Sequence, residues 1–158
     1  IESSNGIIHE INNVLTPPAN DIVTLAANTP SLSTLAAAVE KAGLVEDLQG
    51  GGPFTVFAPD NDAFEALFDL LDVSGLDDLT ANQLRPILLY HVVEGRVISS
   101  ELPNGFVPTL NESASININN AVFTINTETD QLIELGDGTL NVQANNGVVH
   151  IVDTVLLP

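Results

Sequence analysis

Three histidines, His9, His91 and His150, are the residues best suited to acid–base or metal chemistry in this chain. They stand too far apart in the sequence to predict a metal triad. Tyr90 and His91 form an adjacent pair that could bind a partner or exchange protons. Neighbours on a strand point to opposite faces, which favours structural hydrogen bonding for this pair. His150 lies in an apolar stretch, so we expect its ring to bond to a backbone carbonyl.

The run Asp60-Asn61-Asp62 places in a row three oxygen ligands of the kind that calcium prefers. No glycine or distant glutamate follows at the spacing of an EF-hand. Asp62 and Glu65 have the spacing of a capping box, so the run predicts the start of a helix. We expect solvated turns at the other acidic clusters, with one weak calcium site among them as the alternative: Asp77-Asp78, Glu128 to Asp130, and Asp137.

A catalytic constellation is not evident in the sequence. Ser99 and Ser100 lack the context of a nucleophile elbow, and there is no cysteine to act as a thiol nucleophile. The Gly50-Gly51-Gly52 run lacks the lysine and serine of a phosphate-binding loop. We therefore expect a protein that is not an enzyme, with no cofactor.

Charge excludes one class of partner. The chain has 158 residues, with 21 acidic against 3 basic side chains and a formal net charge of −18. Nucleic-acid binding needs clustered lysine and arginine, so that function is not expected. The acidity favours either solubility in salty water or the binding of divalent cations. The apolar runs are too short to cross a bilayer, and no signal peptide is visible, so the chain is expected to be an internal fragment.

The elements that must position these residues fall into two halves. Apolar periodicity and capping residues predict helices at 21–28, with Asp21 as cap, and at 32–42, between Ser31 and Gly43. Further helices are predicted at 60–71, with Phe64, Leu67, Phe68 and Leu71 on the inner stripe, and at 84–90, where Pro86 is tolerable only near the start.

Alternating residues predict strands mainly in the second half of the chain. They cover 54–57, 92–93, 96–98, 106–107, 115–119, 122–126, 139–144 and 147–152. Asn119-Asn120 is a plausible tight turn between two of them, and Asn145-Asn146-Gly147 predicts a second hairpin. Helices followed by strands indicate an α+β fold, with helices packed on an antiparallel sheet or sandwich.

The two ends of the chain repeat one another. The segment 5–17 (NGIIHEINNVLTP) is echoed 141 residues later by 146–158 (NGVVHIVDTVLLP), with Asn, Gly, His, Val, Leu and Pro kept in place. A period of this length is one whole domain. We expect residues 1–17 to be the closing strand of a preceding repeat plus the start of a linker, and residues 18–158 to be one complete domain. The alternative is an N-terminal strand that belongs to this domain and only mimics the last one.

Three motifs in the expected order resemble those of the fasciclin (FAS1) domain family over about residues 18–158. They are the run 55–64 (TVFAPDNDAF), Tyr90-His91, and the closing run 146–158. The residues that match the family's structural signature are Thr55, Phe57, Pro59, Asn61, Phe64, Asn146, Gly147, His150, Asp153 and Pro158.

The resemblance implies a wedge-shaped β-sandwich with several helices packed at one side. It also implies an extracellular or cell-surface (secreted) adhesion module in tandem copies, with a protein or glycan partner and neighbouring repeats. The alternative function is a structural spacer or stalk repeat, rigidified by calcium. Receptor binding by the matching region of animal relatives makes Tyr90 and His91 the candidate interaction motif. Acidity, the absence of cysteine and the abundance of asparagine favour a bacterium or archaeon of saline habitat as the source, so together with the resemblance we expect a repeat of a bacterial or archaeal surface protein. We expect no direct membrane insertion by this segment.

Overall fold

The computed structural model describes residues 2–3, 6–7, 20–98, 100, 104–111, 114–119, 124–126, 132–134 and 142–158. Its helices are α1 (Ile22–Asn28), α2 (Ser33–Ala42), α3 (Val45–Gly50), α4 (Asn61–Leu71) and α5 (Ala81–Tyr90), with 3₁₀ turns η1 (Pro30–Leu32) and η2 (Leu76–Asp78). Its strands are β1 (Glu2–Ser3), β2 (Gly6–Ile7), β3 (Phe54–Pro59), β4 (Val92–Glu94), β5 (Gly105–Pro108), β6 (Ser115–Asn119), β7 (Thr124–Asn126), β8 (Leu132–Glu134), β9 (Val142–Ala144) and β10 (Gly147–Val152).

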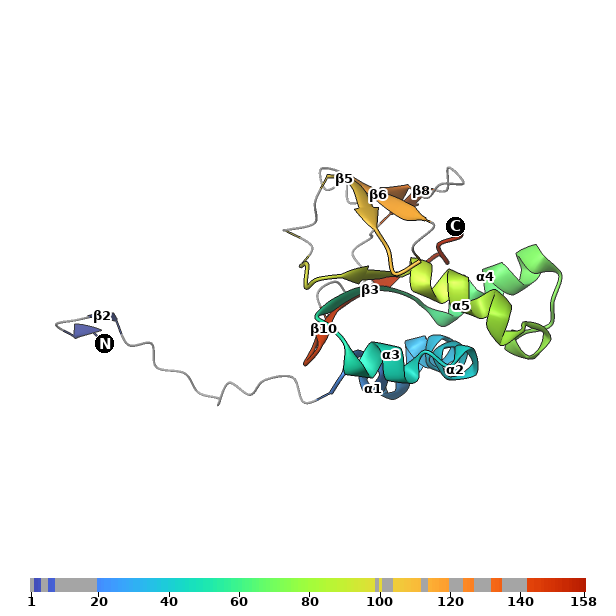
Figure 1. Ribbon diagram of the computed structural model, residues 1–158, viewed down its shortest axis with the longest axis horizontal. Coiled ribbons are helices and arrows are strands. Elements are labelled where there is room, and N and C mark those ends of the chain that lie inside the picture. Colours follow the sequence, from blue (N-terminus) through green and yellow to red (C-terminus); the bar gives the residue numbers. More distant parts are fainter. Residues whose placement is uncertain are drawn as a thin grey trace.

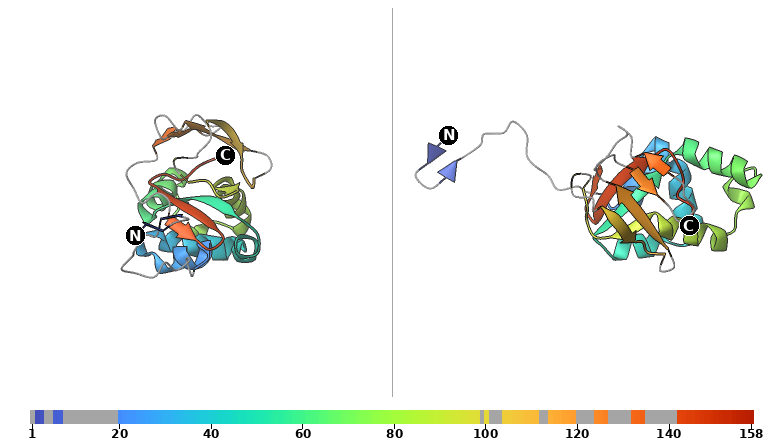
Figure 2. Two further views of the ribbon diagram at one scale, coloured as in Figure 1. Left: turned by 90° about the vertical axis from the view of Figure 1, so that its left-hand side faces the viewer. Right: turned by 90° about the horizontal axis from the view of Figure 1, so that it is seen from above.

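The strands form two four-stranded sheets and a short hairpin. The first sheet has the order β4-β3-β10-β9, and the second has the order β5-β6-β7-β8. β10 pairs with β3 in parallel and with β9 in antiparallel fashion. The first sheet is therefore mixed, because of the parallel β3–β10 pair, whereas the second sheet is antiparallel as the sequence predicted. The β1–β2 hairpin lies apart from the rest of the described chain (Figures 1 and 2).

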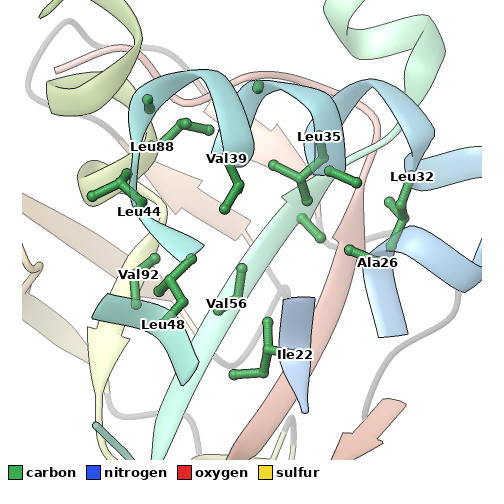
Figure 3. Packing of buried hydrophobic residues seen from close by; sticks show 14 of the residues in the cluster. Ile22, Ala26, Leu32, Leu35, Val39, Leu44, Leu48, Val56, Leu88 and Val92 are labelled. Atoms are coloured by element: carbon green, nitrogen blue, oxygen red, sulfur yellow. The ribbon is translucent and has the colours of Figure 1, made fainter. Parts of the chain in front are cut away.

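Helices α1, α2 and α3 and the second sheet lie on opposite sides of the first sheet, and α4 and α5 lie toward one end of it (Figure 1). One core cluster lies between the helices and the first sheet, and Ile22, Leu35, Val39, Leu48 and Val56 converge in it (Figure 3). A second cluster joins the two sheets and includes residues of β3, β6, β7 and β10. All six residues of β3 are buried, as expected for a central strand covered on both faces. The α+β class and the helices packed at one side are confirmed.

Capping residues start the helices, though not always the expected ones. Asp21 caps α1 as predicted, and its carboxylate accepts a hydrogen bond from the Thr24 N–H at 2.7 Å. Gly43 ends α2 in the left-handed conformation, also as predicted. Ser31 does not cap α2, because it lies within η1 and the helix begins two residues later. The 3₁₀ turn includes Ser31 and Leu32, which were predicted as the cap and the first residue of that helix.

Several elements differ from their predictions. α3 was missed, because its six residues are too short to show periodicity. Pro86 lies in the middle of α5 rather than near its start. Arg96 to Ile98 form no strand. Asn119 belongs to β6 and pairs with Thr124 on β7, so the predicted tight turn at Asn119-Asn120 was wrong. β8 was not predicted.

Candidate functional site

Tyr90 and His91 lie at the C-terminal end of α5, not on a strand. α5 begins with a capping box formed by Thr80 and Gln83, and His91 is its C-cap residue with helical backbone angles. Both side chains are buried, with 0% and 1% of their surface exposed. The expectation that the pair alternates along a strand was wrong. Helical geometry instead sends the two rings toward different parts of the fold.

His91 connects α5 to the C-terminal segment. The Leu156 N–H donates to His91 Nε2 at 2.8 Å, so this nitrogen carries no proton. His91 Nδ1 therefore carries the proton and donates to the Ile87 carbonyl at 2.7 Å. Burial lowers the pKa of His91 from its ordinary 6.5 to about 4, and the bond to Ile87 opposes this change only in part. The ring is neutral at physiological pH, and both of its nitrogens are engaged.

Tyr90 connects α5 to the second sheet. Its hydroxyl donates to the Ser115 carbonyl, at the start of β6, at 2.9 Å. The ring belongs to the cluster between the two sheets. Tyr90 and His91 thus hold three elements together from the interior. Their role as an interaction motif stays a prediction, and any partner would have to reach them through the residues that cover them.

His150 is a buried histidine in the middle of the first sheet. Its Nε2 lies 3.0 Å from the Val97 carbonyl, the kind of backbone partner expected from the sequence. The ring stacks on Phe57, its register partner on β3, with centroids 5.6 Å apart. Burial lowers the pKa of His150 as well. His9, its counterpart in the echo, lies outside the described residues.

The first family motif organises the ends of β3. Thr55 Oγ1 donates to the Gly95 carbonyl at 2.7 Å and accepts from the Val97 N–H at 2.9 Å. Asp60, directly after Pro59, caps α4 by accepting from the Ala63 N–H. The oxygens of Asp60-Asn61-Asp62 therefore begin a helix as expected, although Asp60, and not Asp62, is the capping residue.

Asn61 joins α4 to α2. Its Oδ1 accepts from the Thr34 N–H at 3.0 Å and from the Ser33 hydroxyl at 3.3 Å, and its Nδ2 donates to the Pro30 carbonyl at 3.0 Å. α2 has no side-chain cap of its own. A side chain 27 residues further along the chain thus supplies that cap. Phe64, one turn further along α4, is buried in the core.

The closing motif fixes the start of β10. Asn146 Oδ1 accepts from the Ile22 N–H at 3.0 Å, and its Nδ2 donates to the Leu48 carbonyl at 2.6 Å. A Cβ at position 147 would collide with the Phe54 carbonyl, so only glycine fits between β10 and β3. Asp153 and Pro158 are exposed, and the Asp153 carboxylate accepts from the Thr154 hydroxyl.

Metal ligands do not converge in the part of the chain that the structure describes. No group there of three or more His, Asp or Glu side chains could hold an ion. Asp77 lies 3.8 Å from Lys41, and Asp78 accepts from the Ser74 N–H. Glu128 to Asp130 and Asp137 lie outside the described residues. The calcium expectation stays a prediction for those acidic segments.

An accessible histidine base is also missing from the described residues. His91 and His150 are buried. A cavity of about 180 Å³ lies between the sheets, and Glu94 is the acidic residue in its lining. Ser100 is exposed, and Ser99 lies outside the described residues.

In the described chain, no single helix has the length and apolar character to cross a membrane. One pair of helical segments reaches that length and apolar character only when its two parts are counted together. These parts are Ile22–Asn28 and Pro30–Ala42, and the chain bends by 108° between them.

Two exposed apolar features were not singled out in the sequence. Phe106 on β5 is 76% exposed, and Leu70 and Leu71 at the end of α4 are 69% and 43% exposed. Leu71 had been assigned to the inner stripe of α4, and that assignment was wrong. The alternation of Phe106 with Val107 was a signal that one of the two faces outward, but it could not say which one.

Comparison with known proteins places these features in context. The family model described as "Fasciclin domain" matches residues 30–158. The chain is 39% identical to "Protein sll1483" of Synechocystis sp. over 149 residues, which cover 94% of this chain and 79% of that protein. It is 31% identical to "Transforming growth factor-beta-induced protein ig-h3" of Sus scrofa, over 97% of this chain and 21% of that protein.

A cell-surface protein and a solved structure are also similar. The chain is 35% identical to "Cell surface glycolipoprotein MPB83" of Mycobacterium bovis, over 87% of this chain and 60% of that protein. The structure of a FAS1 domain pair from the insect cell adhesion molecule fasciclin I matches with a TM-score of 0.68 at 19% identity. That match covers 100% of this chain and 57% of the other. The chain thus spans from about a fifth to four fifths of these proteins.

Proposed function

Because the chain belongs to the fasciclin domain family, we propose that it is a non-catalytic extracellular adhesion module that binds a protein or glycan partner. The family match over residues 30–158 is the observation that carries the proposal. The names of two similar proteins, a cell adhesion molecule and a cell surface glycolipoprotein, support the setting. The buried state of His91 and His150 supports the absence of catalysis, since neither ring can take a proton from a substrate.

The outer face of the second sheet is the proposed contact surface for a glycan. Phe106 is exposed on β5, and its register partner on β6 is Asn117. Directly opposed residues of an antiparallel pair share one face. An exposed aromatic ring can stack on the apolar face of a sugar, and an amide beside it can both donate and accept hydrogen bonds. Ile116 is buried and its register partner Val107 is partly buried against the same cluster, so the other face of this sheet packs on the core.

A glycan and matrix-protein array with the full chain tests the proposal. Selective binding that is lost in Phe106→Ala and kept in Leu70→Ser would support the surface on β5 and β6. Both positions are exposed, so neither change should disturb folding. If selective binding is unchanged in Phe106→Ala, the contact surface for the glycan lies elsewhere on the protein. No selective binding to any probe would favour the alternative, a spacer repeat without a ligand.

The proposed domain organisation has residues 1–17 closing a preceding repeat and residues 18–158 forming this domain. The structure gives a reason for the residues that the echo keeps. Asn146 and Gly147 make contacts at the start of β10 that other residues could not make, and His150 is buried against Val97. Asn5, Gly6 and His9 occupy the same places in the echo. Their retention is expected if this segment completes a similar domain.

A further inference from the structure

An apolar groove lies beside the point where the chain leaves the domain. It has a volume of about 110 Å³ and is formed by one face of α4 and by the C-terminal segment. Leu70, in its wall, is 69% exposed, and the adjacent Leu71 is 43% exposed. The residues of this exit groove are Ala63, Ala66, Leu67, Leu70, Thr154, Val155 and Leu157.

The chain is anchored at a residue within the stretch that lines the exit groove, between Val155 and Leu157. Leu156 is fully buried, and its N–H donates to His91 Nε2. Two residues, Leu157 and Pro158, remain after this anchor. Any continuation of the chain therefore starts next to Leu70 and the other groove residues.

The start of the domain is anchored just as firmly. The Asn20 carbonyl accepts from the Asn145 N–H at 2.9 Å, and the Ile22 N–H donates to Asn146 Oδ1. Residue 20 is thus tied to the turn between β9 and β10. In a tandem array, the leading end of each module is fixed from this residue onward.

The sequence repeat gives the number of residues between the two anchors in an array. It aligns Leu15 with Leu156 and Pro17 with Pro158, so four residues, 16–19, separate the last anchor of one module from the first anchor of the next. A fully extended chain spans at most about 3.6 Å per residue, so the two anchors lie within about 18 Å. The next module cannot move away from the exit groove.

We propose that the exit groove is the docking site for the following copy of this module, which covers it with its leading end, around Asn20 and the β9–β10 turn. The inference rests on the tandem array within the proposed function. A linker this short gives an effective concentration in the millimolar range, so a small apolar contact is enough to hold the modules together. Such a contact is of the head-to-tail type, in which two different surfaces meet and the array extends in one direction.

Charge gives this contact a recognisable salt dependence. Both partners carry many carboxylates, and the whole chain has a net charge of −18. Repulsion between them opposes docking at low ionic strength and is screened over about 10 Å at 0.1 M salt. An apolar contact between acidic modules should therefore tighten as salt is added. A contact built on ion pairs would weaken instead.

The absence of cysteine allows a direct test. In a protein in which residues 18–158 follow Pro158 directly, Leu70→Cys is placed in the first module or in the second, and the rate of thiol labelling is measured. At effective concentrations in the millimolar range, we expect the second module to cover the groove of the first about 80% of the time. The thiol in the first module should therefore react about fivefold more slowly than the thiol in the second. The difference should grow between 0.01 M and 1 M NaCl.

Two controls accompany this test. Phe106→Cys, on the second sheet, should react at one rate in both modules. A flexible insertion of about 20 residues after Pro158 should return the first-module Leu70→Cys to the rate of the second module, because the effective concentration falls with linker length. Leu71→Cys repeats the test if Leu70→Cys does not fold.

Equal rates in both modules at every salt concentration would overturn the inference. That result would leave the adhesion proposal intact, since glycan binding is measured on the single chain. If the single chain binds no glycan while the first-module thiol reacts slowly, the adhesion proposal is contradicted and the docking proposal is supported.

Discussion

His91 holds the end of the chain in place by using both of its ring nitrogens at once. One accepts from the Leu156 N–H and the other donates to the Ile87 carbonyl, within a fully buried environment. A protonated ring has no acceptor, so protonation would break the bond to Leu156 and leave a charge in the core. The neutral ring is therefore part of the folded state.

The depressed pKa of His91 predicts that the folded state loses stability in mild acid. Between pH 6.5 and about 4 the unfolded chain binds a proton at this position and the folded chain does not, so the free energy of unfolding falls as the pH falls. The loss from His91 alone reaches about 3 kcal/mol at pH 4 and is absent above pH 6.5. Urea denaturation at several pH values measures it.

His91→Gln separates this effect from the titration of the carboxylates. Glutamine can accept from the Leu156 N–H but does not titrate, so the variant should be less stable at pH 7 yet show a flatter pH dependence between 6.5 and 4. His150, whose pKa is also lowered, adds to the slope in both proteins. Identical slopes for the two proteins would contradict the assignment.

Gly147 is predicted to be irreplaceable, because its missing side chain lets β10 approach β3. Gly147→Ala would push a methyl group into the Phe54 carbonyl and should cost about 3 kcal/mol or more, in the range of severe overpacking. Gly43→Ala is the matched control. It faces open space with φ at +69°, and its cost should be only about 1 kcal/mol. Thermal denaturation compares the two, and similar costs would argue against the close approach.

At the scale of elements, α2 depends on α4 for its N-terminal cap. Asn61→Ala removes the acceptor for Thr34 and the donor to Pro30, and should lower the free energy of unfolding by about 1–2 kcal/mol. Glu65→Ala, an exposed change on the same helix, should stay within about 0.5 kcal/mol of the parent protein. Chemical denaturation that gives equal values for the two variants would refute the capping role.

How far the sequence predicts these elements depends on how local their causes are. Asp21 and Gly43 act on their own helix, and both were predicted correctly. The cap of α2 comes from Asn61 on another helix, so no local pattern reveals it. Parallel pairing of β10 with β3 also joins distant segments, whereas the β9–β10 hairpin could be predicted from Asn145-Asn146-Gly147.

The candidate site shows the same division. The family motifs could be found because residue type and order are visible in a sequence, and they include Tyr90, His91 and Asn146, which make contacts between elements. Their contacts were not visible: the strand geometry applied to the pair was wrong, although the helix predicted at 84–90 did include Tyr90. The exposure of Leu71 and Phe106 depends on what each element packs against, which periodicity alone does not give.

At the scale of the molecule, residues 1–17 are predicted to be dispensable for this domain. Within the described residues, β1 and β2 pair only with each other, and neither sheet of the domain includes them. A chain that starts at residue 18 should therefore keep its thermal midpoint within a few degrees of the full chain, measured by circular dichroism. If residues 18–158 fail to fold, the segment belongs to this domain and the array is wrong.

The position of β10 has a consequence for the way such a protein is synthesised. Among the strands of these two sheets this strand is made last, yet it lies in the centre of the first sheet, and the bond from Ile22 to Asn146 joins residues 124 apart in sequence. At about 5–20 residues per second, a ribosome needs many seconds to deliver β10 after β3 has emerged. Until then the nascent domain keeps an open gap beside β3. In an array, the closing segment of the preceding repeat has a similar sequence and is already present. It can pair with β3 before β10 is made, so strand exchange between neighbouring modules competes with correct folding.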